Sequence, residues 1–198
     1  ALVASVATII SGLLPLHPRL SMLSMRYIVA FASGIVIGTA LFEMLPEGEA
    51  GANWLIIGVG FFSFYLLEMV ITIHTCGEEE CEPKSIGIGS LIGISADNLV
   101  DGAAIAAGYY INPLLGLFIA GAVVVHEVPQ GLTTTVVMKN SRYSIRRILL
   151  ILVIAAVLYP VGAMISSFMP PIFYTQMIAF VAGEFLYIGA GELLPEAH

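Results

Sequence analysis

The sequence predicts an all-α membrane protein, a polytopic bundle whose helices cross the bilayer. Of its 198 residues, 59% are hydrophobic and only 11% are charged. A soluble domain of this size cannot hide so much apolar surface. The hydrophobic residues also recur in long runs along the whole chain, a pattern that does not indicate a cleaved signal peptide.

Seven hydrophobic segments are visible, and most have the ~20 apolar residues that a bilayer-spanning helix needs. They cover residues 1–16, 26–47, 53–75, 85–110, 113–138, 146–168 and 172–195. Backbone groups in lipid are satisfied only in helices or closed barrels, and runs of this length predict helices. The first segment is the shortest and begins at residue 1.

The basic residues predict an orientation. All seven fall in alternate connections between segments, at Arg19, Arg26, Lys84, Lys139, Arg142, Arg146 and Arg147. The positive-inside rule places these connections in the cytoplasm and the N-terminus outside. The short loops favour a prokaryotic plasma membrane. The net charge is −7, and no basic patch indicates a nucleic-acid partner.

Two polar motifs lie within neighbouring hydrophobic segments. Residues 97–102 read DNLVDG, and residues 126–131 read HEVPQG. An ionisable group in the bilayer core costs several kcal/mol unless it is paired, hydrated or bound to metal, so it marks function by default. Both motifs lie near the middle of their segments, the depth at which transporters tend to hold substrate.

The motifs supply six candidate metal ligands: Asp97, Asn98, Asp101, His126, Glu127 and Gln130. Asp97 and Asp101 share a helix face because they are four residues apart, and so do His126 and Gln130. Glu127 projects about 100° from His126. Imidazole suits zinc, iron, nickel or copper, and oxygen ligands suit manganese or magnesium. A reversible site for a divalent cation is therefore predicted.

Other functions are compatible with the same residues. The acids are also suited to a proton- or sodium-coupled carrier of another solute. Polar packing between helices explains a single Asn or Gln, but it accounts less well for two Asp, one Glu and one His at one depth. An enzyme is not predicted, because HEVPQ lacks the second His of the zinc-peptidase motif.

Several further residues are candidates for the pathway or for a loop site. Glu43 and Glu184 lie within apolar segments, and Glu184 faces either the pathway or a dimer contact. His74, Cys76 and Cys81 flank an acidic connection that either collects metal or is simply a solvated turn. The Cys-x4-Cys spacing is not a standard zinc signature.

An internal repeat appears at an offset of 149 residues. Phe31, Gly34, Glu43, Leu45, Pro46 and Glu47 match Phe180, Gly183, Glu192, Leu194, Pro195 and Glu196. The two copies run in opposite directions in the predicted topology, as in the inverted repeats of transporters. The chain then divides into a first repeat at 1–75, a central helix pair at 85–138 and a second repeat at 146–198, with an eighth helix expected after His198.

Taken together, these motifs resemble the Zrt/Irt-like (ZIP) family of divalent metal transporters. The resemblance rests on Asn98-x-x-Asp101-Gly102, on His126-Glu127-x-Pro129-x-Gly131, and on the Leu-Pro-Glu ends of the second and seventh segments. It implies eight helices in a 3+2+3 arrangement and transport of zinc, or of iron, manganese or cadmium, into the cytosol. It also implies an elevator-like motion and a homodimer in the lipid bilayer. The metal is cargo, and no cofactor is implied.

The resemblance also implies which residues bind metal. A transport site would use Asp97, Asp101, His126 and Gln130, and a neighbouring site would use Asn98, Asp101, Glu127 and Gln130. Many members have His at position 97 and Glu at position 130. The loss of that second bridging carboxylate favours a single-metal site or an altered metal preference in this chain.

Overall fold

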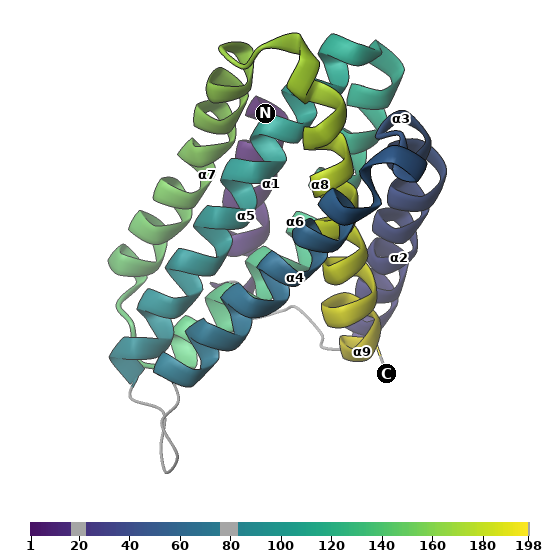
Figure 1. Ribbon diagram of the computed structural model, residues 1–198. Helices are drawn as coiled ribbons and strands as arrows, with labels where there is room; N and C mark the ends of the chain where they lie inside the picture. Colours follow the sequence, from purple (N-terminus) through teal and green to yellow (C-terminus); the bar gives the residue numbers. More distant parts are fainter. Residues whose placement is uncertain (17–22, 76–82, 198) are drawn as a thin grey trace.

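A computed structural model describes residues 1–16, 23–75 and 83–197, and every regular element in that part of the chain is helical (Figure 1). The elements are α1 (Leu2–Leu13), η1 (Leu14–Leu16), α2 (Leu23–Thr39), η2 (Ala40–Met44), α3 (Leu45–Glu47), α4 (Ala50–Thr75), α5 (Pro83–Ile111), α6 (Pro113–Asn140), α7 (Ile145–Ser167), η3 (Pro171–Phe173), α8 (Tyr174–Tyr187), η4 (Ile188–Leu193) and α9 (Leu194–Glu196).

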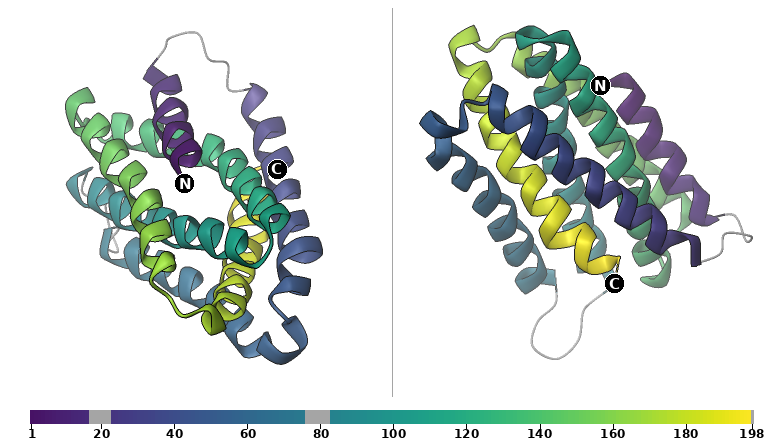
Figure 2. Two further views of the ribbon diagram at one scale, coloured as in Figure 1. Left: turned by 90° about the horizontal axis from the view of Figure 1, so that it is seen from above. Right: turned by 90° about the vertical axis from the view of Figure 1, so that its right-hand side faces the viewer.

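Six continuous helical spans in the described residues are long and apolar enough to cross a membrane. They are Arg26–Glu47, Gly51–Ile73, Leu91–Ile111, Pro113–Asn140, Ile145–Ser167 and Pro171–Leu193. The predicted all-α polytopic fold is confirmed. The first predicted segment forms a shorter apolar helix, Leu2–Leu16, which packs against α6 and α7 (Figure 2).

The helix α5 lies within the bundle, in contact with α4, α6, α7 and α8. By contrast, α4 packs mainly on α8 and exposes most of its length. Only 6% of its most apolar 18-residue stretch is buried. Trp54, Leu55 and Phe62 are each more than half exposed on it. Such a continuous apolar surface suits hydrocarbon rather than water.

The contact between α5 and α7 depends on two glycines. A Cβ atom added at Gly102 would overlap the carbonyl oxygen of Tyr159, and one added at Gly162 would overlap that of Leu99. Small residues at these positions let the two backbones approach closely, which is a common way to pack helices in membranes. The approach holds the polar motif of α5 against α7.

Two π-helical segments occupy equivalent places. In η2 the N–H of Leu45 donates to Ala40, and in η4 the N–H of Leu194 donates to Gly189, five residues back in each case. Each segment is followed by Leu-Pro-Glu, whose proline lacks a backbone donor. The helices that contain them run in opposite directions, with α3 and α9 at opposite ends (Figure 1). This is the arrangement that an inverted repeat requires.

Candidate metal site

Three side chains from two neighbouring helices meet in the interior of the bundle. Asp97 and Asp101 lie one helical turn apart on α5, and His126 faces them from α6. One ligand atom of each lies within 4.8 Å of the other two, and all three residues are buried. His126 Nε2 is 3.2 Å from Asp101 Oδ2 and 3.8 Å from Asp97 Oδ2. We call this group the triad.

The spacing of the triad suits a divalent ion. Zinc bonds imidazole nitrogen and carboxylate oxygen at about 2.0–2.2 Å, which places tetrahedral ligand atoms about 3.3–3.6 Å apart. The separations of 3.2 and 3.8 Å are close to that value. Neither oxygen of Asp101 and neither ring nitrogen of His126 has a hydrogen-bond partner among the described residues. Unpaired buried polar atoms are uncommon, and here they converge as metal ligands do.

Neighbouring side chains hold the triad in place. The ring of Phe185 meets that of His126 edge-on, with centroids 5.7 Å apart. The amide nitrogen of Gln130 donates to Asp97 Oδ2 over 2.7 Å, and its oxygen is unpartnered within the described structure. The amide nitrogen of Asn98 donates to the carbonyl oxygen of Ala155 on α7, over 3.0 Å. Gln130 therefore borders the triad, whereas Asn98 is tied through its nitrogen to the neighbouring helix.

Glu127 points to a different place. Thr8 on α1 donates a hydrogen bond to its Oε2 atom, and the hydroxyl of Tyr159 on α7 lies beside the same carboxylate. Glu127 is completely buried and, like Glu184, lies outside the cluster of ligand atoms formed by the triad. The projection of about 100° from His126 accounts for this position.

Glu184 approaches the triad from another helix. It lies on α8 and is completely buried, and neither of its carboxylate oxygens has a hydrogen-bond donor in the described part of the chain. Asp101 and Asp97 act on its carboxylate electrostatically, and the next residue, Phe185, packs on the ring of His126. The oxygens of Glu184 lie outside the 4.8 Å cluster of the triad. Like charges on neighbouring carboxylates repel one another more strongly inside a bundle than in water. A cation between them removes that repulsion.

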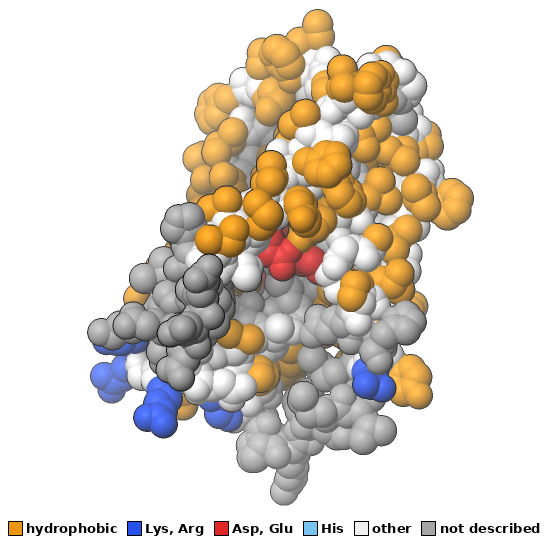
Figure 3. All heavy atoms as spheres, turned by 60° about the horizontal axis from the view of Figure 1, so that its bottom comes forward, with side chains coloured by type: hydrophobic (Ala, Val, Ile, Leu, Met, Phe, Trp, Pro, Cys, Tyr) orange, Lys and Arg blue, Asp and Glu red, His pale blue; other side chains and the backbone are white. Residues whose placement is uncertain are grey.

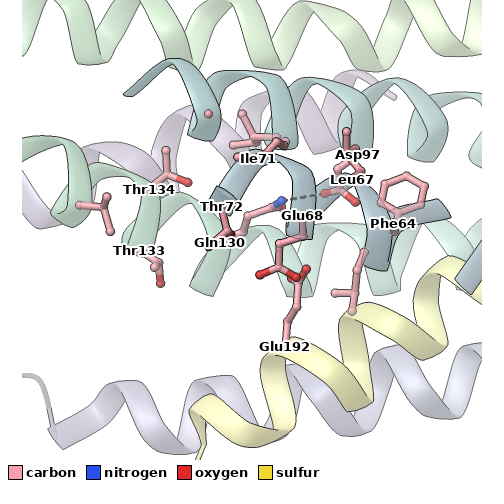
Figure 4. Close-up of a pocket in the computed structure, with 15 residues that line it drawn as sticks. Phe64, Leu67, Glu68, Ile71, Thr72, Asp97, Gln130, Thr133, Thr134 and Glu192 are labelled. Atoms are coloured by element: carbon pink, nitrogen blue, oxygen red, sulfur yellow. Dashed lines mark hydrogen bonds between the residues drawn. The ribbon is translucent and has the colours of Figure 1, made fainter. Parts of the chain in front are cut away.

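A groove of about 420 Å³ leads from the triad to one end of the bundle. It is lined by Phe64, Leu67, Glu68, Ile71, Thr72, Gly89, Gly93, Ile94, Asp97, Gln130, Thr133, Thr134, Val137, Ile188 and Glu192. Glu68 and Glu192 point toward one another in it (Figure 4). A smaller cavity of about 130 Å³ shares Gln130 and Thr134 and reaches His126. The acids gather in a hollow ringed by apolar side chains (Figure 3).

The described basic side chains lie at the end where the groove opens (Figure 3). Arg26, Lys139, Arg142, Arg146 and Arg147 are all exposed there. On the other side of the triad, Ala104, Ile119, Val123 and Ile178 belong to one buried apolar cluster and are each 0% exposed. The site is therefore accessible from the basic end and closed by apolar packing toward the opposite end.

A family model described as "ZIP Zinc transporter" matches residues 74–198, which is more than half of the sequence. The chain belongs to the ZIP family. The predicted resemblance is thereby confirmed, and the match is to a family of transporters rather than of enzymes. With the six apolar spans, membership also makes this ZIP chain an integral membrane protein.

Individual relatives agree with the family. The zinc transporter YKE4 of Saccharomyces cerevisiae is 22% identical over 88% of this chain and 61% of its own length. The zinc transporter ZIP13 of Pongo abelii is 23% identical over 87% of this chain and 58% of its own length. The metal cation symporter ZIP8 of Rattus norvegicus is 33% identical over 50% of this chain and 22% of its own length. This ZIP chain thus spans about 60% or less of these relatives.

The remaining predicted residues have different positions. Glu43, in η2, is half-buried and does not line the groove. Cys76 and Cys81 lie outside the described residues, and so does the side chain of His74. Glu68 and Glu192 were not among the predicted ligands, although both line the groove. The sequence could have indicated that Glu192 lies on the same helix face as Glu184, because the two are eight residues apart, with Ile188 between them, and residues four apart share a face.

Proposed function

We propose that this ZIP chain moves divalent transition metal ions, zinc first among them, across a membrane into the cytosol. The observation that carries the proposal is the buried triad of Asp97, Asp101 and His126 at the inner end of an acidic groove. A mixed oxygen and nitrogen site binds zinc reversibly, and it also suits iron, manganese or cadmium. Gln130 is the adjacent neutral ligand.

The groove supports a route between the triad and the basic end. Glu68 and Glu192 face it with their carboxylates, and Thr133 and Thr134 add hydroxyl groups. A divalent ion that leaves the triad meets oxygen ligands before it reaches bulk water. These groups replace part of the hydration shell, which lowers the barrier for moving a charge through an apolar bundle.

The positive-inside rule supports the proposed direction. It assigns the basic end to the cytoplasm and the start of α1 to the outside. The groove then opens to the cytosol, and this structure corresponds to an inward-facing state. The short loops favour a prokaryotic plasma membrane, although the relatives named above are eukaryotic. In this proposal the chain consists of a first repeat at 1–75, a central helix pair at 85–138 and a second repeat at 146–198. Two copies of the chain form a homodimer.

Titration calorimetry tests the metal site. Purified protein is titrated with Zn²⁺, Mn²⁺, Fe²⁺ and Cd²⁺, beside an Asp101→Ala/His126→Ala double variant and an exposed-acid control, Glu47→Gln. We expect the double variant to lose at least ~100-fold in zinc affinity, because two of the three triad ligands are gone. The control should bind as the unsubstituted chain does.

The other outcomes are also informative. A Cys76→Ser/Cys81→Ser variant separates the triad from the acidic loop. If the triad variant binds zinc normally and the cysteine variant does not, the metal belongs to the loop and the proposal is wrong. If no metal binds the unsubstituted chain, the intramembrane acids serve a proton- or sodium-coupled carrier of another solute. Thermal unfolding of each variant checks that it is folded.

A further inference from the structure

We infer that Glu184 is a metal ligand supplied by α8, which moves toward a bound ion and completes a four-ligand site together with Asp97, Asp101 and His126. This inference rests on the proposed function, because it concerns the same ion. It adds a ligand from a third helix, outside the two polar motifs. The triad supplies three ligand atoms, and zinc in proteins takes four ligands in its commonest geometry.

The position of Glu184 is difficult to explain by packing alone. Its side chain is 0% exposed, and within the described residues it has no hydrogen-bond donor on either oxygen. A buried carboxylate normally accepts several hydrogen bonds or pairs with a cation. The groups that face Glu184 electrostatically are themselves carboxylates, those of Asp101, Asp97 and Glu192. Such a set favours an ion with charge +2 at its centre.

The other candidates for the fourth position are weaker ligands or are engaged elsewhere. Gln130 presents a neutral amide whose nitrogen already donates to Asp97. Glu127 accepts a hydrogen bond from Thr8 on the far side of α6. Glu184 is thus the carboxylate beside the triad that is free of a hydrogen-bond donor in the described structure.

The location of Glu184 has a structural consequence. Asp97 and Asp101 belong to α5 and His126 to α6, whereas Glu184 belongs to α8. An ion held by all four residues links three helices. Metal binding should therefore stabilise the contact between α8 and the α5–α6 pair. The rise in unfolding temperature on addition of the ion measures this stabilisation.

Calorimetry with Zn²⁺ on Glu184→Gln and Glu184→Ala, beside Glu47→Gln, tests the inference. Loss of an outer-shell partner costs about 10–100-fold in metal affinity, so loss of this ligand should weaken zinc binding at least that much. The stoichiometry should stay at one ion per chain. Electronic spectra of bound Co²⁺ should also change, because they report the number and geometry of the ligands.

The results separate this inference from the proposed function. If Asp101→Ala/His126→Ala abolishes zinc binding while both Glu184 variants bind normally with an unchanged Co²⁺ spectrum, the inference fails and the proposed function stands. If the double variant also binds normally, both fail. Glu184→Gln preserves the shape of the side chain, so it keeps the test valid if Glu184→Ala does not fold.

Discussion

At the scale of single residues, Glu127 shows how a buried carboxylate is held beside the proposed metal site without joining the triad. Its partner Thr8 comes from α1, the short helix that packs against α6. A hydrogen bond to a charged group contributes about 1.5–3 kcal/mol, and a buried charge left without its donor costs more. Thr8 therefore contributes to the stability of the bundle rather than to the ligand shell.

We predict that Thr8→Val lowers the unfolding temperature more than Thr135→Val does. Both threonines are completely buried and donate across the contact between α1 and α6, but Thr8 bonds a carboxylate and Thr135 bonds the carbonyl of Gly12. The expected losses are about 1.5–3 and 0.5–1.5 kcal/mol respectively. Thermal unfolding in detergent measures both, and equal losses would argue against a charged acceptor at Thr8.

The sequence anticipated part of the site at this scale. The four-residue spacing of Asp97 and Asp101 predicted a shared face, and the structure places His126 opposite them. Thr8 was not predicted as the partner of Glu127, because helix periodicity says nothing about which distant helix packs on a given face. For the same reason, the sequence left open whether Glu184 faces the pathway or a dimer contact.

At the scale of elements, the close contact of α5 and α7 controls the position of the polar motif. Gly102 follows Asp101 directly and touches the backbone of Tyr159. Any side chain at this position pushes the two helices apart. The proposed metal site and the packing of α5 on α7 are therefore coupled through Gly102.

We expect Gly102→Ala to destabilise the protein by about 1–3 kcal/mol, the usual effect of overpacking, and to weaken zinc binding by displacing Asp101. Gly121→Ala on α6 is the matched control, because nothing lies within 4 Å of its added Cβ. Replacing a helical glycine that has room for a methyl group stabilises by about 0.5–1 kcal/mol. Chemical or thermal unfolding measures the stability of each variant, and calorimetry measures its zinc affinity. Equal stability and equal zinc affinity of Gly102→Ala and Gly121→Ala would contradict the proposed coupling.

Helices were easier to predict than their irregularities. The hydrophobic segments predicted the ends of the helices to within about three residues, because length and hydropathy decide what crosses a bilayer. The π-helical segments η2 and η4 were not predicted. Pro46 and Pro195 mark their places, yet whether a helix responds to proline by a kink, a break or an extra residue depends on packing around it.

At the scale of the whole molecule, the structure combines an open end and a closed end around one buried site. The groove that reaches Asp97 lies on the side of the basic loops, while apolar side chains fill the bundle on the other side. A transporter must close one path while the other is open, or ions leak down their gradient. The asymmetry is therefore what a metal carrier requires in one of its states.

Cysteine labelling tests this asymmetry. In a background with Cys76 and Cys81 replaced by Ser, we predict that Thr134→Cys in the groove reacts with a membrane-impermeant maleimide from one side of oriented vesicles. That side should be the one from which Arg142→Cys, in an exposed loop, is labelled. Ile119→Cys, at a position that is 0% exposed, should react from neither side. Zinc should slow the labelling of Thr134→Cys, because the ion occupies the inner end of the same groove. Reaction of Thr134→Cys from the side opposite to Arg142→Cys would show that the site opens outward and would reverse the inward-facing assignment.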